Sequence, residues 1–273
     1  MNQISLDNSN ISNFLNHLNK KGFILEDKTY KLLKAHFPSY EIIRNLAIEG
    51  TTPQTGTNNI QHAEIDLFVR TPNNDLVIEC KRTSFTWFFP KNKDRKNIIY
   101  FVYDTNKGLT KKGLISDDAI TTYSDLALEI SADGKVTPNT NYKDVRDNTN
   151  QVLRTMQIYL SKITPLKRFI SKALIPVIVT NTPLYLVTYK TEQLTSNGDL
   201  NAPVDITQIP FLAYNVSRLM RWDVDCSQTI KHIGYKEASD PDDFQTVFIC
   251  NVETLNKFIA FIEDSSLVAM RVL

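Results

Sequence analysis

Two carboxylates and one ammonium, Asp66, Glu79 and Lys81, occupy neighbouring stretches of this sequence in which polar residues alternate with apolar ones. Carboxylate oxygens are the hard ligands that Mg²⁺ prefers, and Mg²⁺ needs only one or two of them because it keeps several waters. An ammonium beside such a cation can orient an attacking water and offset the negative charge that develops on a phosphate. If the three side chains converge, the chemistry that they could support is metal-assisted hydrolysis of a phosphodiester bond.

Two predicted strands would position these side chains. The stretches 62–70 and 75–82 alternate apolar and polar residues with a period of two, which is typical of β-strands. The link 71–74, Thr-Pro-Asn-Asn, has the composition of a turn, so the strands are expected to form a hairpin. Paired strands lie about 4.8 Å apart, and the hairpin can therefore bring residues of both strands within a few ångströms of one another.

The period of two also predicts which side chains share a face. Glu79 and Lys81 are two residues apart and are expected on one face of the second strand. In the first strand Asp66 and Glu64 are expected opposite an apolar face that consists of Ala63, Ile65, Leu67 and Val69. One alternative stays open for the trio, namely an exposed cross-strand ion pair, which contributes little to stability.

The spacing of Ile65-Asp66 and Glu79-Cys80-Lys81 resembles the motif of the PD-(D/E)xK nuclease superfamily, with Ile65 in place of the motif's proline. The resemblance implies an α/β fold with a restriction-endonuclease-like core, in which helices flank a mixed central β-sheet. It also implies that Asp66 and Glu79 are metal ligands, together with the backbone carbonyl of Cys80. Lys81 would then orient the attacking water and stabilise charge, and acting as the general base is the bolder alternative.

The resemblance divides the chain into a core and two additions. It covers residues 22–82 and 150–190, so a nuclease core is expected over 1–190 with an insertion at 83–149. Residues 191–273 are expected to form a C-terminal elaboration packed on this core.

Two further residues match positions that contribute to the site in this superfamily. Glu26 lies on the same stripe of a predicted helix as Tyr30 and Leu33, and superfamily members often supply a further acid to the metal from this helix. The alternative for Glu26 is an acid that favours the helix macrodipole. Gln151, at the start of a later helix, resembles the glutamine of Mrr-like branches that contacts the site, and a helix residue without a role is the alternative.

The pattern of apolar and polar residues in the rest of the chain predicts further elements, both within the insertion and on either side of it. Apolar spacing indicates helices and alternation indicates strands. We expect helices over 11–18, 25–36, 150–163 and 251–262, strands over 40–48, 175–180, 184–189 and 211–215, a hairpin around 132–134, and a polar loop over 139–150.

A basic and aromatic segment follows the second hairpin strand. Residues 81–112 carry nine Lys or Arg against two acids, with aromatic residues interleaved. Such a segment can contact phosphates and stack on bases. The alternative is a solvated basic loop whose aromatic side chains belong to the core. Its position after the candidate catalytic strand favours substrate contact, and the candidate nucleic-acid-binding residues are Arg82, Lys91, Lys93, Arg95 and Lys96.

Composition narrows the class of protein. A net charge of +1, 42% hydrophobic residues and three scattered cysteines predict a soluble protein without a zinc site or a disulfide framework. The sequence has no stretch of the length and apolarity of a bilayer span and no secretory signal, so a cytoplasmic protein is expected and no membrane partner. It also has no Walker loop, so a motor or specificity subunit would be a separate protein.

These observations predict a Mg²⁺-dependent endonuclease that hydrolyses phosphodiester bonds of DNA, in a restriction or defence role, with Mn²⁺ able to replace Mg²⁺. Cutting both strands would require a homodimer or two sequential nicks. Two other functions stay open: a non-catalytic nucleic-acid-binding or assembly subunit that keeps the fold, and an RNase on the same scaffold. A binder needs none of Asp66, Glu79 and Lys81, and their joint presence therefore favours the nuclease.

Overall fold

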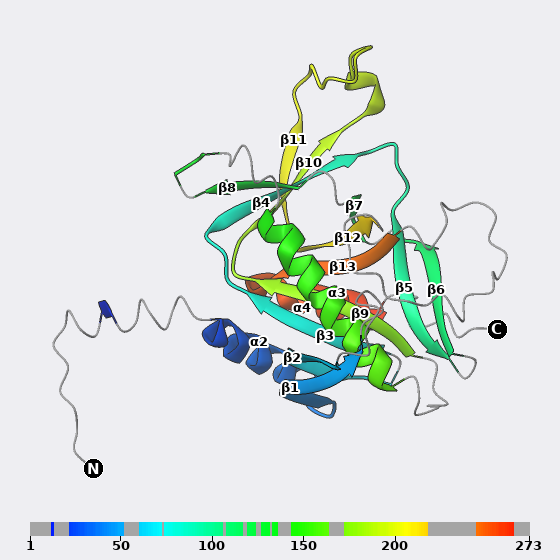
Figure 1. The fold of residues 1–273 in the computed structure, drawn as a ribbon. Coiled ribbons are helices and arrows are strands. Elements are labelled where there is room, and N and C mark those ends of the chain that lie inside the picture. Colours follow the sequence, from blue (N-terminus) through cyan, green and yellow to red (C-terminus); the bar gives the residue numbers. More distant parts are fainter. Residues whose placement is uncertain are drawn as a thin grey trace.

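A computed structural model gives the fold of the chain, a mixed α/β arrangement in which helices cover both faces of a large mixed β-sheet (Figure 1). A smaller sheet stands beside it. The structure describes residues 12–13, 22–51, 60–72, 74–105, 108–116, 119–123, 127–131, 133–135, 143–163, 172–217 and 244–264.

Within the described residues the large sheet has nine strands: β1 (Glu41–Thr51), β2 (Ile60–Arg70), β3 (Asn74–Lys81), β5 (Ile98–Thr105), β6 (Gly108–Ile115), β7 (Thr121–Tyr123), β9 (Lys172–Thr180), β12 (Phe211–Ser217) and β13 (Phe244–Asn251). Its order is β1-β2-β3-β9-β13-β12-β7, and the β5–β6 hairpin joins it at β9. The central strands β3, β9 and β13 are parallel and buried on both faces, which explains their continuous apolar runs.

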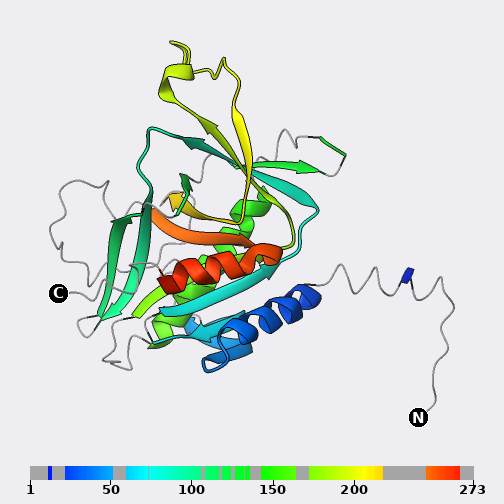
Figure 2. The ribbon, with the colours of Figure 1, turned by 180° about the vertical axis from the view of Figure 1, so that it is seen from behind.

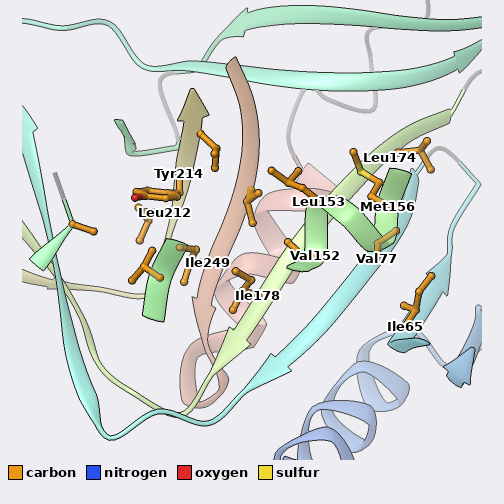
Figure 3. Packing of buried hydrophobic residues seen from close by; sticks show 14 of the residues in the cluster. Ile65, Val77, Val152, Leu153, Met156, Leu174, Ile178, Leu212, Tyr214 and Ile249 are labelled. Carbon is orange, nitrogen blue, oxygen red and sulfur yellow. The ribbon is translucent and has the colours of Figure 1, made fainter. Parts of the chain in front are cut away.

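Helices bury these apolar strands from both sides. The helix α3 (Lys143–Ile163) covers one face, and α2 (Phe23–His36) and α4 (Leu255–Asp264) cover the other (Figure 2). Figure 3 shows the core on the α3 side, where Val152 and Met156 of the helix pack against strand residues such as Val77 and Ile178. The short 3₁₀ helices are η4 (Thr191–Gln193) and η7 (Val252–Thr254). No helix in the described ranges combines the length and the apolarity that crossing a bilayer requires.

The second sheet continues the two strands that lie at the centre of the first. It consists of β4 (Phe85–Asn92), β8 (Leu128–Ser131), β10 (Leu184–Tyr189) and β11 (Asp205–Ile209), in the order β11-β10-β4-β8. The chain passes from β3 directly into β4 and from β9 directly into β10, and both pairs are parallel. Two hydrogen bonds join the β3–β4 connection to the β9–β10 connection. Asn181 Oδ1 accepts from the Thr83 amide at 2.9 Å, and Thr182 Oγ1 donates to the Phe85 carbonyl at 2.6 Å.

The main elements predicted from the sequence are confirmed. The hairpin is formed by β2 and β3, the predicted helix 25–36 is α2, and the later strands are β9, β10 and β12. The predicted helix at 11–18 lies outside the described residues except for Ser12 and Asn13. The boundaries proposed at 82/83 and 190/191 stay predictions, and strands pair across both of them, since β4 pairs with β10 and β13 with β9.

Two predictions about the insertion are wrong. The expected loop at 139–150 is helical from Lys143, and the buried Glu129 carboxylate accepts a hydrogen bond from the Val145 amide at 2.8 Å, which satisfies a free donor of the first helical turn. The aromatic side chains after β3 are largely core residues rather than stacking platforms, since four of them are at most 1% exposed: Trp87, Phe89, Tyr100 and Phe101.

Lys91 is a structural residue of this region rather than a phosphate contact. It is 8% exposed, and its ammonium donates to the Arg95 carbonyl at 3.1 Å and to Asn97 Oδ1 at 2.8 Å. Burial, together with the nearby Arg95, lowers the pKa of Lys91 to about 8. The turn after β4 therefore uses this ammonium internally, which corrects the prediction of a nucleic-acid contact.

The lowered pKa of Lys91 predicts a pH dependence of stability. Between about pH 8 and pH 10 the unfolded chain binds this proton more tightly than the folded chain, so the free energy of unfolding should rise with pH, on the order of 1 kcal/mol for a partly solvated group. Urea unfolding of the wild type and of Lys91→Met at both pH values measures the difference, because other groups titrate in both proteins. An equal pH response of the two proteins would contradict the prediction.

Candidate active site

The site begins where β2 separates from β3. Backbone pairing joins Leu67–Arg70 of β2 to Asp75–Ile78 of β3 and then stops. If the pairing continued in the same register, Cys80 would pair with Ile65. The Cys80 amide donates instead to Asp66 Oδ2 at 2.7 Å. The Asp66 carboxylate thus takes the place of a backbone carbonyl, while β9 holds the other edge of β3 as far as Lys81.

The side-chain alternation of both neighbouring strands reverses at this point. In β2, Ile65 packs in the core on the α3 side, whereas Leu67 packs in the core on the α2 and α4 side. In β1, Ile43 and Leu46 both contact the α3-side core although they are three residues apart. The prediction that Ala63, Ile65, Leu67 and Val69 share one face is therefore wrong, because the strand changes face at Asp66.

Asn45 lies opposite Asp66 at the reversal. The register of β1 and β2 passes from Arg44↔Leu67 to Leu46↔Ile65. Asn45 has φ 49°, and among the described residues no other residue except glycine has a positive φ. Asparagine tolerates this left-handed conformation better than most residues, which explains its presence in the middle of a strand.

Glu79 is the most buried carboxylate of the site. Its side chain is 3% exposed, and its Oε1 accepts from the Lys81 ammonium at 2.7 Å and from the Gln151 amide at 2.5 Å. Glu79 and Lys81 share a face of β3, as predicted from their spacing, and Gln151 reaches them from α3. Within the described structure neither Glu79 Oε2 nor Asp66 Oδ1 accepts a hydrogen bond, so one oxygen of each carboxylate remains for another ligand.

Burial and mutual repulsion raise the pKa values of the carboxylates. Burial, then the charge of Asp66, raises the pKa of Glu79 to about 7, although Lys81 opposes the shift. Burial also raises the pKa of Asp66, against the effects of the Cys80 amide and Lys81. The pKa of Glu26 is raised by burial and by Asp66. The acids are close enough to disfavour one another's charge, and a cation would relieve this repulsion.

Glu26 lies on α2, which packs on the face of the sheet opposite to α3. A methyl group placed on Gly22 would lie 3.4 Å from Glu26 Oε1 and 3.7 Å from the Cys80 carbonyl oxygen. Both oxygens therefore border the space beside Gly22, at the start of α2. Gly22 has helical backbone angles, φ −63° and ψ −26°, so its conformation does not require glycine. Its missing side chain leaves the space beside the two oxygens open.

A cavity of about 770 Å³ joins these groups. Its volume lies in the range of ordinary ligand pockets. It is lined by Glu26, Asn45, His62, Ala63, Glu64, Asp66, Glu79, Lys81, Asp147, Asn150, Gln151, Arg154 and Thr155. The residues Glu26, Asp66, Glu79, Lys81 and Gln151, predicted from the sequence, thus meet in one place.

The donor set fits a hard divalent cation that retains water. Asp66 and Glu79 each keep one carboxylate oxygen, and the Cys80 carbonyl borders the space beside Gly22 and Glu26, although Cys80 is not among the residues that line the cavity. Among the residues that the structure describes, no group of three or more His, Cys, Asp or Glu side chains could hold a metal. Mg²⁺ does not need such a cage, since it binds through one or two carboxylates, waters and substrate oxygens.

The candidate nucleic-acid contacts lie elsewhere. The residues Arg82, Lys93, Arg95 and Lys96 are exposed, and none of them lines the cavity. Lys93 pairs with Asp205 at 2.8 Å, which joins the turn after β4 to β11. Their contact with a substrate stays a prediction.

Sequence reasoning missed Gly22, which borders Glu26 and the Cys80 carbonyl, and four residues that line the cavity: Asn45, Asp147, Asn150 and Arg154. The polar face of α3 could have indicated the last three, because they are spaced like Gln151 on one side of a helix. No local pattern marked Asn45 or Gly22, whose roles depend on distant strands.

A comparison with known families agrees with this geometry. Residues 21–112, about a third of the chain, match NERD, the nuclease-related domain. The segment is therefore similar to a nuclease-related domain. That family belongs to the PD-(D/E)xK-like nuclease superfamily, as the motif predicted, and the match supports nuclease activity in general. No curated protein and no solved structure matches the chain.

The segment that matches the nuclease-related domain contains most of the candidate site but not all of it. Glu26, Asp66, Glu79 and Lys81 lie inside the matched residues, and Gln151 lies outside them. The site is completed by α3, which follows the insertion. The restriction-endonuclease-like fold is consistent with the mixed sheet and its flanking helices, and the Mrr-like branch stays a prediction.

The left-handed conformation of Asn45 gives a testable prediction. Asn45→Gly should retain the stability of the wild type approximately, whereas Asn45→Ala should be less stable than Asn45→Gly by about 1 kcal/mol, because alanine disfavours positive φ. Denaturant unfolding of the three proteins measures this difference. Equal stability of the alanine and glycine variants would show that β1 does not need the conformation.

Proposed function

We propose that this chain is a Mg²⁺-dependent endonuclease that hydrolyses phosphodiester bonds, with DNA as substrate and a restriction or defence role. The observation that carries the proposal is the meeting of Asp66, Glu79 and Lys81 in one cavity of a nuclease-related domain. Mn²⁺ is expected to replace Mg²⁺, since both prefer carboxylate oxygens.

The metal-binding residues would be Asp66 and Glu79, with the Cys80 carbonyl. When bound there, a divalent cation would polarise the phosphodiester and make water more acidic. Gln151 and Lys81 both donate to Glu79 Oε1, and they therefore fix the orientation of this carboxylate and leave Oε2 available to a cation. The Cys80 amide orients Asp66 in the same manner through Oδ2.

Lys81 would act directly on the substrate. Its side chain is 22% exposed and lines the cavity, while its contact with Glu79 limits where the ammonium can lie. From this position the ammonium can donate to a phosphate oxygen and stabilise the charge that develops as the bond to the attacking water forms. This assignment makes Lys81 an electrostatic catalyst rather than a general base.

Two other functions are separated by experiment. A non-catalytic binding subunit would not require the buried Glu79–Lys81 pair, whose burial is costly unless the site uses it. An RNase would use the same residues, so only the substrate distinguishes it from a DNase. DNA is preferred here because the superfamily resemblance implies it.

Cleavage assays test the proposed function. With Mg²⁺, the wild type should cut plasmid DNA, EDTA should stop it, and Asp66→Asn or Lys81→Ala should lower the rate at least about 100-fold. Lys135→Ala, which removes a lysine that is 82% exposed in a turn outside the cavity, is the matched control and should cut normally. Gel analysis of the products over time measures the rates.

Two outcomes would change the proposal. Cutting of RNA but not DNA would assign the RNase function to the same residues. If the wild type bound DNA but cut neither substrate with Mg²⁺ or Mn²⁺, the chain would be a binding subunit.

The space beside Gly22 tests the metal-binding residues. Gly22→Ala should fold normally, because the added methyl meets only ordinary contacts, but it should occupy space between Glu26 and the Cys80 carbonyl. The Mg²⁺ concentration for half-maximal cleavage is then expected to rise several-fold, and Glu26→Gln should act in the same direction. Thermal unfolding serves as the control, and an unchanged Mg²⁺ requirement in both variants would remove Glu26 from the metal site.

A further inference from the structure

One face of α3 forms a wall of the cavity. Asp147, Asn150, Gln151, Arg154 and Thr155 all line it, at the spacings of three, four, seven and eight residues that keep side chains on one side of a helix. The opposite side of the helix carries buried residues of the core. This polar stripe is therefore fixed toward the cavity by the packing of the whole helix.

Gln151 determines where the stripe lies relative to the candidate catalytic residues. Its amide is 2.5 Å from Glu79 Oε1, so this turn of α3 is in direct contact with β3. Side chains three residues apart on a helix are neighbours, with about 5–6 Å between their Cβ atoms. Arg154 therefore neighbours Gln151, the residue that contacts Glu79, on the same wall of the cavity.

Charge distinguishes Arg154 from its neighbours. The carboxylates Glu26, Glu64, Asp66, Glu79 and Asp147 line the cavity, and of the lysines and arginines only Lys81 and Arg154 do so within the described part of the chain. Lys81 is held by Glu79 on the strand side. A substrate strand with a phosphate at each nucleotide thus meets an arginine on the helix side, whose planar donors match phosphate oxygens in pairs.

We propose that Arg154 binds a phosphate of the nucleic-acid strand next to the one that is cut, and so holds the strand between α3 and the gap that separates β2 from β3. This inference rests on the proposed function for the identity of the substrate. Arg154 contacts the substrate in the ground state and in the transition state alike. Its loss should accordingly raise KM and leave kcat nearly unchanged.

A phosphate contact also has a signature that a structural role lacks. Each phosphate that a protein neutralises releases counterions, so the logarithm of the affinity falls with the logarithm of the salt concentration, by a slope of about 0.7–0.9 per contact. Removing Arg154 should reduce this slope by about one contact. A variant that merely loosens the helix would lower the affinity without this specific change in slope.

The test measures binding without cutting. Fluorescence anisotropy with labelled single-stranded and double-stranded DNA, over a range of salt concentrations, is carried out in Lys81→Ala protein, to which Arg154→Gln, Arg154→Lys or Arg146→Gln is added. Arg146 is the matched control, since it lies on α3, carries the same charge and does not line the cavity. Arg154→Gln should weaken binding about tenfold and lower the slope by about one, Arg154→Lys should keep the slope, and Arg146→Gln should change neither.

Steady-state cleavage with Lys81 intact completes the test, with thermal unfolding as the check on folding. A raised KM with kcat within about threefold supports the inference for Arg154→Gln. An unchanged salt slope overturns it, as does a large loss of kcat without a change in KM. If Arg154→Gln does not fold, Arg154→Lys takes its place: weaker binding than in the Lys81→Ala parent, at the same slope, supports the inference because the paired donors are lost, and an unchanged affinity overturns it. Failure of the wild type to cut would refute the nuclease alone, because the binding experiment does not depend on cleavage.

Discussion

The hydrogen bond from the Cys80 amide to Asp66 is the interaction on which the site depends. A buried strand amide must find an acceptor, and continued pairing with β2 would supply one and close the gap. Because a side-chain carboxylate supplies it at 2.7 Å, the two strands can separate while β3 stays attached to β9 on its other edge. The separation turns the Cys80 carbonyl and one oxygen of Asp66 toward open space, and the change of face at Asn45 and Asp66 accompanies it.

The proposed cation would offset a cost that the arrangement imposes on the free protein. Burial and the proximity of Asp66 raise the pKa of Glu79 to about 7, so its ionised form is disfavoured unless positive charge is nearby. Lys81 supplies part of that charge, and Gln151 supplies a neutral donor from α3. Carboxylates that destabilise one another in the free protein are common where a cation or a substrate compensates.

The second sheet joins the insertion to the rest of the chain through the pairing of β4 with β10. β4 and β10 extend directly from β3 and β9, and hydrogen bonds between their connections hold the two sheets together. Glu129 of β8 accepts from the first turn of α3, and the insertion thereby contacts the helix that carries Gln151 and Arg154. The aromatic side chains of this region mostly belong to the core, and the Lys91 ammonium is used internally, whereas Arg82, Lys93, Arg95 and Lys96 are exposed.

The sequence by itself determined the hairpin, α2 and the candidate residues Asp66, Glu79 and Lys81, because strand and helix periods are local properties and a two-residue spacing is enough to place Glu79 and Lys81 together. It did not determine the change of face at Asp66, the separation of β2 from β3, or the part played by Gly22, Asn45 and Arg154. These features arise from contacts between residues far apart in the chain: β9 holds one edge of β3, α2 and α3 approach from opposite faces, and β1 lies beside Asp66. Only the tertiary structure decided them, since the pairing of distant strands and helices leaves no periodic trace in the local sequence.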